Sequence, residues 1–122
     1  MKKLKYENGS TYEVFDDTVC CPSGNANIRS YFEIWMPEDT MDFSEFEALV
    51  RDKEAMQKLT VLTKDDKEEA VFLNYTLPVE ISKRLVETFS PDTLEAGSET
   101  RLFARMEQPT YIEQKLAELG LM

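Results

Sequence analysis

The longest run of alternating apolar and polar residues spans residues 75–86, YTLPVEISKRLV. Such alternation predicts a half-buried β-strand, because successive side chains of a strand point to opposite faces of the sheet. The pattern assigns one apolar set to the core: Tyr75, Leu77, Val79, Ile81 and Leu85. Pro78 has no backbone N–H to donate, so we expect a sheet edge or a bulge here. With this register, Val79→Asp should unfold the domain and Glu80→Lys should not.

Shorter apolar runs separated by turn residues predict further strands. Residues 4–6 and 11–15 flank an Asn-Gly pair, which favours the positive backbone torsions of a tight hairpin turn. Residues 59–63 and 70–73 flank a charged turn and predict a second hairpin. Hairpins join neighbouring strands in opposite directions, so we expect a mainly antiparallel sheet.

Two stretches alternate but carry large apolar groups on both sides, namely residues 28–36 and 100–108. Phe32, Ile34, Met36, Leu102, Ala104 and Met106 form one set, and Tyr31, Glu33, Trp35, Arg101, Phe103, Arg105 and Glu107 form the other. A strand of this kind is either covered on two sides or presents an aromatic surface to a partner. Turn-forming residues predict loops at 22–27 and 90–99, of which we expect 90–99 to be the more mobile.

Two stretches carry helical signals. Asp42 and Glu45 have the spacing of a capping box, and an apolar stripe follows at Phe43, Phe46, Leu49 and Val50. Thr110 and Glu113 repeat the spacing before a stripe at Ile112, Leu116 and Leu119, and Gly120 stands where a helix stop belongs.

This order of elements predicts one α+β domain over residues 1–122, a length typical of a single domain. We expect a mainly antiparallel sheet of about six to eight strands, curled into a small barrel or folded as a sandwich. One central helix and one C-terminal helix complete the predicted fold.

The charge narrows the range of partners. Asp and Glu number 24 against 14 Lys and Arg, giving a formal net charge of −10. A net negative field repels phosphate backbones and anionic lipids, so we expect neither nucleic acid nor membrane as a partner. The chain shows no signal peptide and no apolar run long enough to span a membrane, which predicts a cytoplasmic protein as synthesised.

The candidate chemistry is sparse. The sequence has no histidine, which removes the Ser-His-Asp and Cys-His arrangements and the zinc sites that use histidine. Cys20 and Cys21 are adjacent, which disfavours a disulfide between them, and Asp16 and Asp17 nearby would not activate a thiol. Acidic clusters lack the spacing of a calcium loop. We therefore expect no enzyme, with no catalytic residues, no cofactor and no metal.

Four residues remain as candidate protein contacts, because aromatic and arginine side chains dominate the energetics of interfaces. They are Tyr31, Trp35, Phe103 and Arg105. A covering helix is the alternative explanation for these outward side chains, and the sequence leaves both open.

Several segments together resemble a known group of proteins: the opening hairpin with its Asn-Gly turn and Glu13-Val14, residues 29–34 followed by FSEFEALV, the runs LTVLT and VFLNYTLPVEI, and the closing LFARMEQPTYIEQKLAEL. The group comprises small uncharacterised prophage-encoded proteins of Firmicutes from the tail and structural gene region. The resemblance implies a structural or accessory role in a phage-like particle, in contact with other phage structural proteins or with itself as a homo-oligomer. The alternative is an acidic inhibitor that occupies a nucleic-acid-binding site on a host enzyme.

Overall fold

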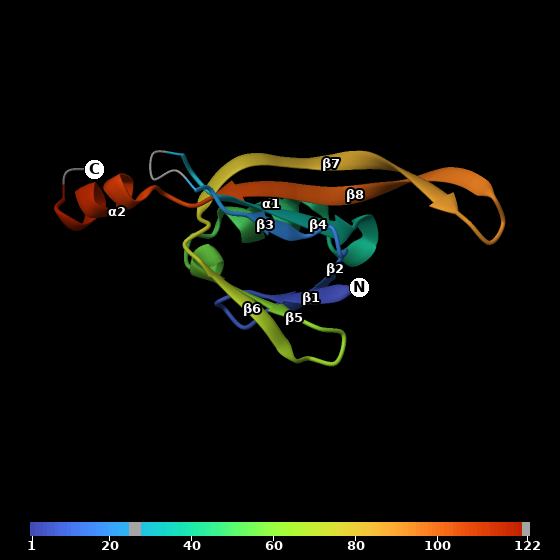
Figure 1. Cartoon of the computed structure of the whole chain (residues 1–122), viewed down its shortest axis with the longest axis horizontal. Coiled ribbons are helices and arrows are strands. Elements are labelled where there is room, and N and C mark those ends of the chain that lie inside the picture. Colours follow the sequence, from blue (N-terminus) through green and yellow to red (C-terminus); the bar gives the residue numbers. More distant parts are fainter. Residues whose placement is uncertain (25–27, 121–122) are drawn as a thin grey trace.

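The computed structural model describes residues 1–24 and 28–120 (Figure 1). Its strands are β1 (Lys2–Lys5), β2 (Thr11–Val14), β3 (Val19–Cys21), β4 (Tyr31–Pro37), β5 (Lys58–Leu62), β6 (Glu68–Leu73), β7 (Leu77–Ser90) and β8 (Glu95–Glu107). Its helices are α1 (Phe43–Arg51) and α2 (Tyr111–Glu118), with short 3-10 turns η1 (Glu38–Thr40) and η2 (Ala55–Gln57).

The strands form two antiparallel sheets with the orders β2-β1-β5-β6 and β3-β4-β8-β7. This confirms the α+β class and the predominance of antiparallel pairing. The sheets are not closed into a barrel, because each keeps two edge strands with a single neighbour. The barrel form of the predicted fold is therefore wrong.

One core lies between the two sheets and α1. All three parts contribute fully buried side chains, among them Leu4, Leu59, Phe32, Ile34, Met36, Phe46, Leu102 and Met106. The alternation of β4 and β8 is confirmed, since one set of side chains enters this core and the other set points away from it. Strand β4 begins at Tyr31, three residues after the predicted start.

Both short hairpins are confirmed. Lys5 pairs with Thr11 across the first turn, and Gly9 has the positive φ of 89° that the Asn-Gly pair predicts. Strands β5 and β6 pair as expected. Residues 22–24 lie outside helices and strands, and the rest of the loop predicted at 22–27 lies outside the described residues.

The two predicted capping boxes have different outcomes. Thr110 accepts a hydrogen bond from the backbone of Glu113, whose side chain accepts from the backbone of Thr110, so this box forms as predicted. Asp42 does occupy the N-cap position of α1, but its side chain makes no capping hydrogen bond. The box at Asp42 and Glu45 is therefore wrong, although the helix starts where the box placed it.

Strand β7 lies at the edge of its sheet and carries a bulge between Pro78 and Glu80, as Pro78 predicted. The extra residue is Val79, which faces solvent with 54% of its surface exposed. The assignment of Val79 to the core is wrong, because a bulge adds one residue to the strand and shifts the alternation beyond it.

The loop predicted at residues 90–99 is also wrong. Beyond the bulge, β7 and β8 pair without a break from Glu80 and Arg105 up to Ser90 and Glu95, and only four residues turn between them. A ladder of backbone hydrogen bonds needs no apolar side chains, so the polar composition of this segment concealed the strands. We call residues 85–100 the arm. In Figure 1 it extends to the right beyond the core, on the opposite side from α2.

Candidate protein-contact surfaces

The four candidate contact residues share one face of the β3-β4-β8-β7 sheet. Trp35 lies directly opposite Phe103, and Arg105 lies opposite Glu33. Directly opposed residues of an antiparallel pair project to the same side. Tyr31 belongs to the same alternating set as Trp35, and this side points away from the core. The structure therefore brings the four residues together on the outer face of the sheet.

Arginine side chains cover the aromatic rings of this face. The guanidinium of Arg84 lies 3.8 Å from the ring centroid of Phe103, and that of Arg105 lies 3.7 Å from the ring centroid of Tyr31. Trp35 packs on Phe103 with ring centroids 4.5 Å apart. Phe103 is fully buried in this stack. The rings are thus covered by cation–π contacts from their own sheet, while α1 packs on the opposite side.

The charges of the outer face are largely paired within it. Glu80 binds Arg84 at 2.6 Å, and hydrogen bonds from Ser82 and then from Arg84 hold the pKa of Glu80 below its ordinary value. Arg101 binds Asp17 at 3.1 Å and also pairs with Glu99.

Arg105 differs from these neighbours. Within the described residues it forms no ion pair, and its buried Nε has no hydrogen-bond partner. Its guanidinium instead stacks on the ring of Tyr31.

The arm carries a second surface, which the sequence analysis missed. Ile81 and Leu102 belong to the side of β7 and β8 that covers the core, and the same side continues along the arm through Leu85 and Phe89. Past the end of the core these side chains are uncovered, with 72% of Leu85 and 62% of Phe89 exposed. Leu94 in the turn is 77% exposed. The prediction that Leu85 enters the core is therefore wrong.

The charge of the arm has a single sign. Residues 85–100 include no Lys or Arg, but they contain Glu87, Asp92, Glu95 and Glu99. Only Glu99 has an ion-pair partner among the described residues, namely Arg101 at the base of the arm. The arm therefore combines exposed apolar side chains with unpaired carboxylates.

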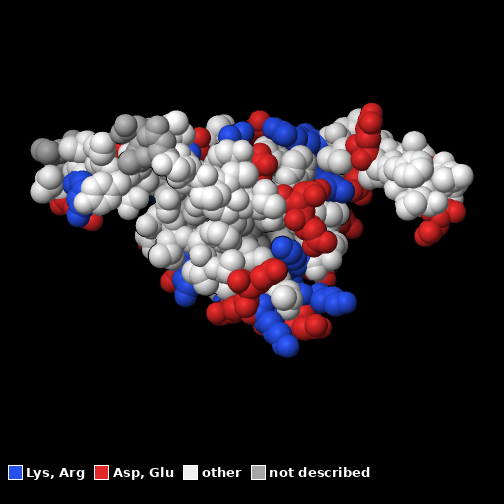
Figure 2. Space-filling model, viewed as in Figure 1, with Lys and Arg blue, Asp and Glu red and all other residues white. Residues whose placement is uncertain are grey.

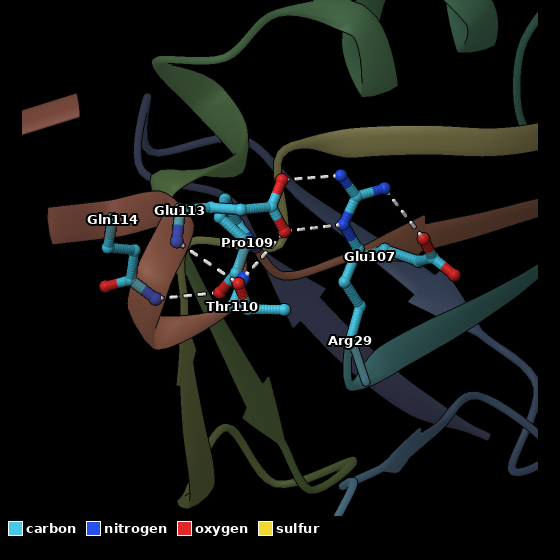
Figure 3. Close-up of polar contacts among 6 residues, drawn as sticks. All are labelled: Arg29, Glu107, Pro109, Thr110, Glu113 and Gln114. Carbon is cyan, nitrogen blue, oxygen red and sulfur yellow. Dashed lines mark hydrogen bonds and ion pairs between the residues drawn. The ribbon is translucent and has the colours of Figure 1, made fainter. Parts of the chain in front are cut away.

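The C-terminal helix α2 is attached mainly through its first turn (Figure 3). Arg29 donates two hydrogen bonds to the carboxylate of Glu113, at 2.9 and 2.6 Å, and also pairs with Glu107 at 3.4 Å. Gln114 donates to the backbone carbonyl of Pro109 at 2.8 Å. The hydrogen bonds from Arg29, with further help from Thr110, lower the pKa of Glu113 from its ordinary 4.5 to about 2.

The apolar stripe predicted on α2 does not enter the core. Ile112 and Leu119 are exposed, Leu116 is half-buried, and no residue of the helix is fully buried. Gly120 takes the positive φ of 73° expected of a helix stop.

The two cysteines point to opposite sides of β3, as neighbours on a strand must. The sulfur of Cys20 lies 3.1 Å from the hydroxyl oxygen of Tyr75, beside a groove of about 590 Å³ lined by apolar residues such as Val19 and Phe72. Both cysteines are free thiols. In residues 1–24 and 28–120, no three acidic or cysteine side chains converge as a metal-binding group.

None of the described helices has the length and apolar character needed to cross a membrane. Comparisons with family models, with curated proteins and with solved structures find no match to this chain. The resemblance to prophage proteins therefore stays a prediction from the sequence.

Proposed function

We propose that the protein is a non-enzymatic protein-interaction module and that the arm is its principal contact element. The observation that carries the proposal is the continuation of the core side of β7 and β8 past the core, where Leu85 and Phe89 stay exposed. Apolar side chains on a strand pair normally gain their stabilisation from a covering layer. Here the fold supplies no such layer, so a partner that covers the arm would gain it on binding.

The outer sheet face supports the same function in a second way. Tyr31, Trp35 and Arg105 lie on the same outer face of the sheet. These residue types are frequent among the strongest contributors to interfaces. The face can thus contribute polar and aromatic contacts beside the apolar contacts of the arm.

We further propose that the partners are phage structural proteins, with this chain as a structural or accessory component of a tail or baseplate. The support for this setting is the sequence resemblance. An element that reaches beyond its own core also suits a subunit that must contact a neighbour in an assembly.

Co-expression with the proteins of the tail gene region tests the proposal. The wild-type chain should co-purify with at least one of them, and Phe89→Ser should lose most of this retention because it removes the exposed ring from the arm. Thr88→Ser lies on the other side of the same strand and serves as the matched control. Equal retention of wild type and Phe89→Ser would contradict the proposed role of the arm.

The alternative function, an acidic inhibitor of a nucleic-acid-binding enzyme, needs carboxylates in rows at the spacing of a duplex. Figure 2 instead shows acidic and basic side chains intermixed over the central body on the face that is drawn. Ion pairs such as Arg84–Glu80 and Arg101–Glu99 also neutralise carboxylates on the outer sheet face. These observations favour the interaction module.

A further inference from the structure

The β3-β4-β8-β7 sheet has a long free edge at β7. Within the described residues, β7 has β8 as its single neighbour, and in Figure 1 it runs along the upper boundary of the molecule into the arm. Backbone N–H and C=O groups of successive residues point to alternate sides of a strand, so every second residue of β7 directs them away from β8. Such an edge is a template for pairing with another strand.

Beyond the bulge, this edge is regular. Residues 80–90 pair with β8 in an unbroken register, and they contain no proline and no glycine. Leu85 is the midpoint of this run. Two copies that pair antiparallel about a two-fold axis at Leu85 therefore use the whole run, with residue 80 of each copy opposite residue 90 of the other.

The charges of the run match in this register. Two ion pairs involve residues 80–90, Glu80–Arg84 at 2.6 Å and Lys83–Glu38 at 3.7 Å. Glu87 has no such partner among the described residues. Pairing about the midpoint places Glu87 opposite Lys83 of the second copy. The ammonium of Lys83 has three donors, which is enough for two carboxylates.

Neighbouring registers lose this match. Opposed residues face the same side of the sheet, so the two-fold axis must lie at a residue. An axis at residue 83, 84 or 87 places Lys, Arg or Glu directly opposite its own copy, which opposes like charges. An axis at residue 86 places Glu87 opposite Leu85 and Phe89 opposite Lys83. An axis farther from the midpoint leaves more than half of the run unpaired.

The same register joins apolar residues on the core side. Leu85 lies opposite its own copy, and Phe89 lies opposite Ile81 of the second copy. Leu85 and Phe89 are exposed in the single chain, whereas Ile81 packs against the core. Each arm is thereby placed beside the rim of the other copy's core, which covers one flank of its apolar side chains. On the outer side, Arg84 approaches its own copy only diagonally, and Glu80 neutralises it within each chain.

Building on the proposed function, we propose that the free edge of β7 is a dimer interface, occupied by β7 of a second copy that pairs antiparallel about Leu85. Self-complementarity selects a second copy over an unrelated strand, because residues 80–90 match their own reversed order in charge and in apolar positions. Both copies contribute the same surface, so the contact is isologous and closes at two subunits. It joins two four-stranded sheets into one continuous sheet.

A charge exchange tests this register. In sedimentation equilibrium, wild-type protein should approach a dimer, and no larger species, as its concentration rises. Lys83→Glu opposes two carboxylates at each pair and Glu87→Lys opposes two ammonium groups, so each variant should dimerise about tenfold more weakly. In an equimolar mixture of the two variants, every Glu again faces a Lys. The mixture should therefore recover close to the wild-type affinity.

Matched controls separate this outcome from general effects of charge. Lys53→Glu and Glu95→Lys make the same charge changes away from the β7 edge, and both should dimerise like wild type. Circular dichroism melting checks the folding of every variant. If a test variant is unfolded, Leu85→Lys replaces it, because this side chain is exposed in the single chain and the register opposes it to its own copy. Leu85→Lys should stay monomeric.

Four results would overturn the inference: a wild-type chain that stays monomeric at high concentration, assembly beyond a dimer, a mixture that stays monomeric, or a Leu85→Lys variant that dimerises like wild type. The fate of the proposed function is read separately by co-purification. A monomeric chain that retains a tail-region protein through Phe89 loses only the dimer. A dimer that retains no such protein keeps the interface and loses the proposed phage partners.

Discussion

Val79 and Ile81 stand two residues apart on β7, yet only Ile81 packs against the core. The bulge separates them: Pro78 lies opposite Met106 and Glu80 opposite Arg105, which leaves Val79 without a partner on β8. Ile81 regains the inner side, opposite Ala104. At the scale of single residues, one extra residue in a strand therefore decides which of two similar side chains is buried.

This difference can be measured. Val79→Asp should cost less than about 1 kcal/mol of unfolding free energy, because its carboxylate remains in water. Ile81→Asp should cost about 3 kcal/mol or more, because it places a charge against the core. Urea denaturation of the two variants beside wild type gives both values. Equal losses would show that the bulge does not exist in solution.

At the scale of elements, α2 shows how a helix can form without contributing to the core. Its start is set by the Thr110 capping box, and its attachment rests on the contact of Glu113 with Arg29. Because the folded pKa of Glu113 lies below its ordinary value, this contact stabilises the fold above about pH 4.5. Its contribution is lost as the pH falls from 4.5 toward 2.

The carboxyl of Glu113 should therefore titrate at about 2 in the wild-type protein when it is followed by NMR. In Arg29→Gln the pKa should rise toward the ordinary 4.5, because the two charged hydrogen bonds are gone. Lys115→Gln is the control, since it removes the ion pair with Glu118 on the same helix and leaves Arg29 in place. An unchanged pKa in Arg29→Gln would mean that Arg29 does not bind Glu113 in solution.

At the scale of the whole molecule, one core carries two projecting elements, the arm and α2, which leave it on opposite sides in Figure 1. The buried side chains belong to the sheets, to α1, to the segments around η2 and Tyr75, and to Tyr6 and Thr18 beside the strands. None of them lies in residues 85–100 or in α2. Folding stability and outward contact surface are thus assigned to different parts of the chain.

Shortening the arm tests this separation. Val86 and Glu99 lie opposite each other, so an Asn-Gly turn in place of residues 87–98 closes a two-residue hairpin. The melting temperature should change by no more than about 4 °C, since no core contact is removed. The maximum dimension measured by small-angle X-ray scattering should fall by about 15 Å. Loss of folding in the shortened protein would show that the arm is part of the folding unit.

The sequence by itself determined the features that depend on a few neighbouring residues. Four such features were predicted: the Asn-Gly turn after β1, the capping box at Thr110, the helix stop at Gly120 and the alternation of β4 and β8. Each arises from backbone conformation or from contacts within about four residues. The clustering of Tyr31, Trp35, Phe103 and Arg105 on one face also follows from alternation, once β4 and β8 are paired.

Only the tertiary structure decided which of these faces are covered. Four features depend on residues distant in sequence. They are the burial of Phe103 beneath Arg84, the exposure of the Val79 side chain, the exposed apolar stripe of α2 and the length of the arm. An apolar stripe has the same pattern whether or not another element packs against it. Whether an apolar face is covered depends on packing between distant segments. For this reason the sequence did not predict the arm, where the proposed contacts lie.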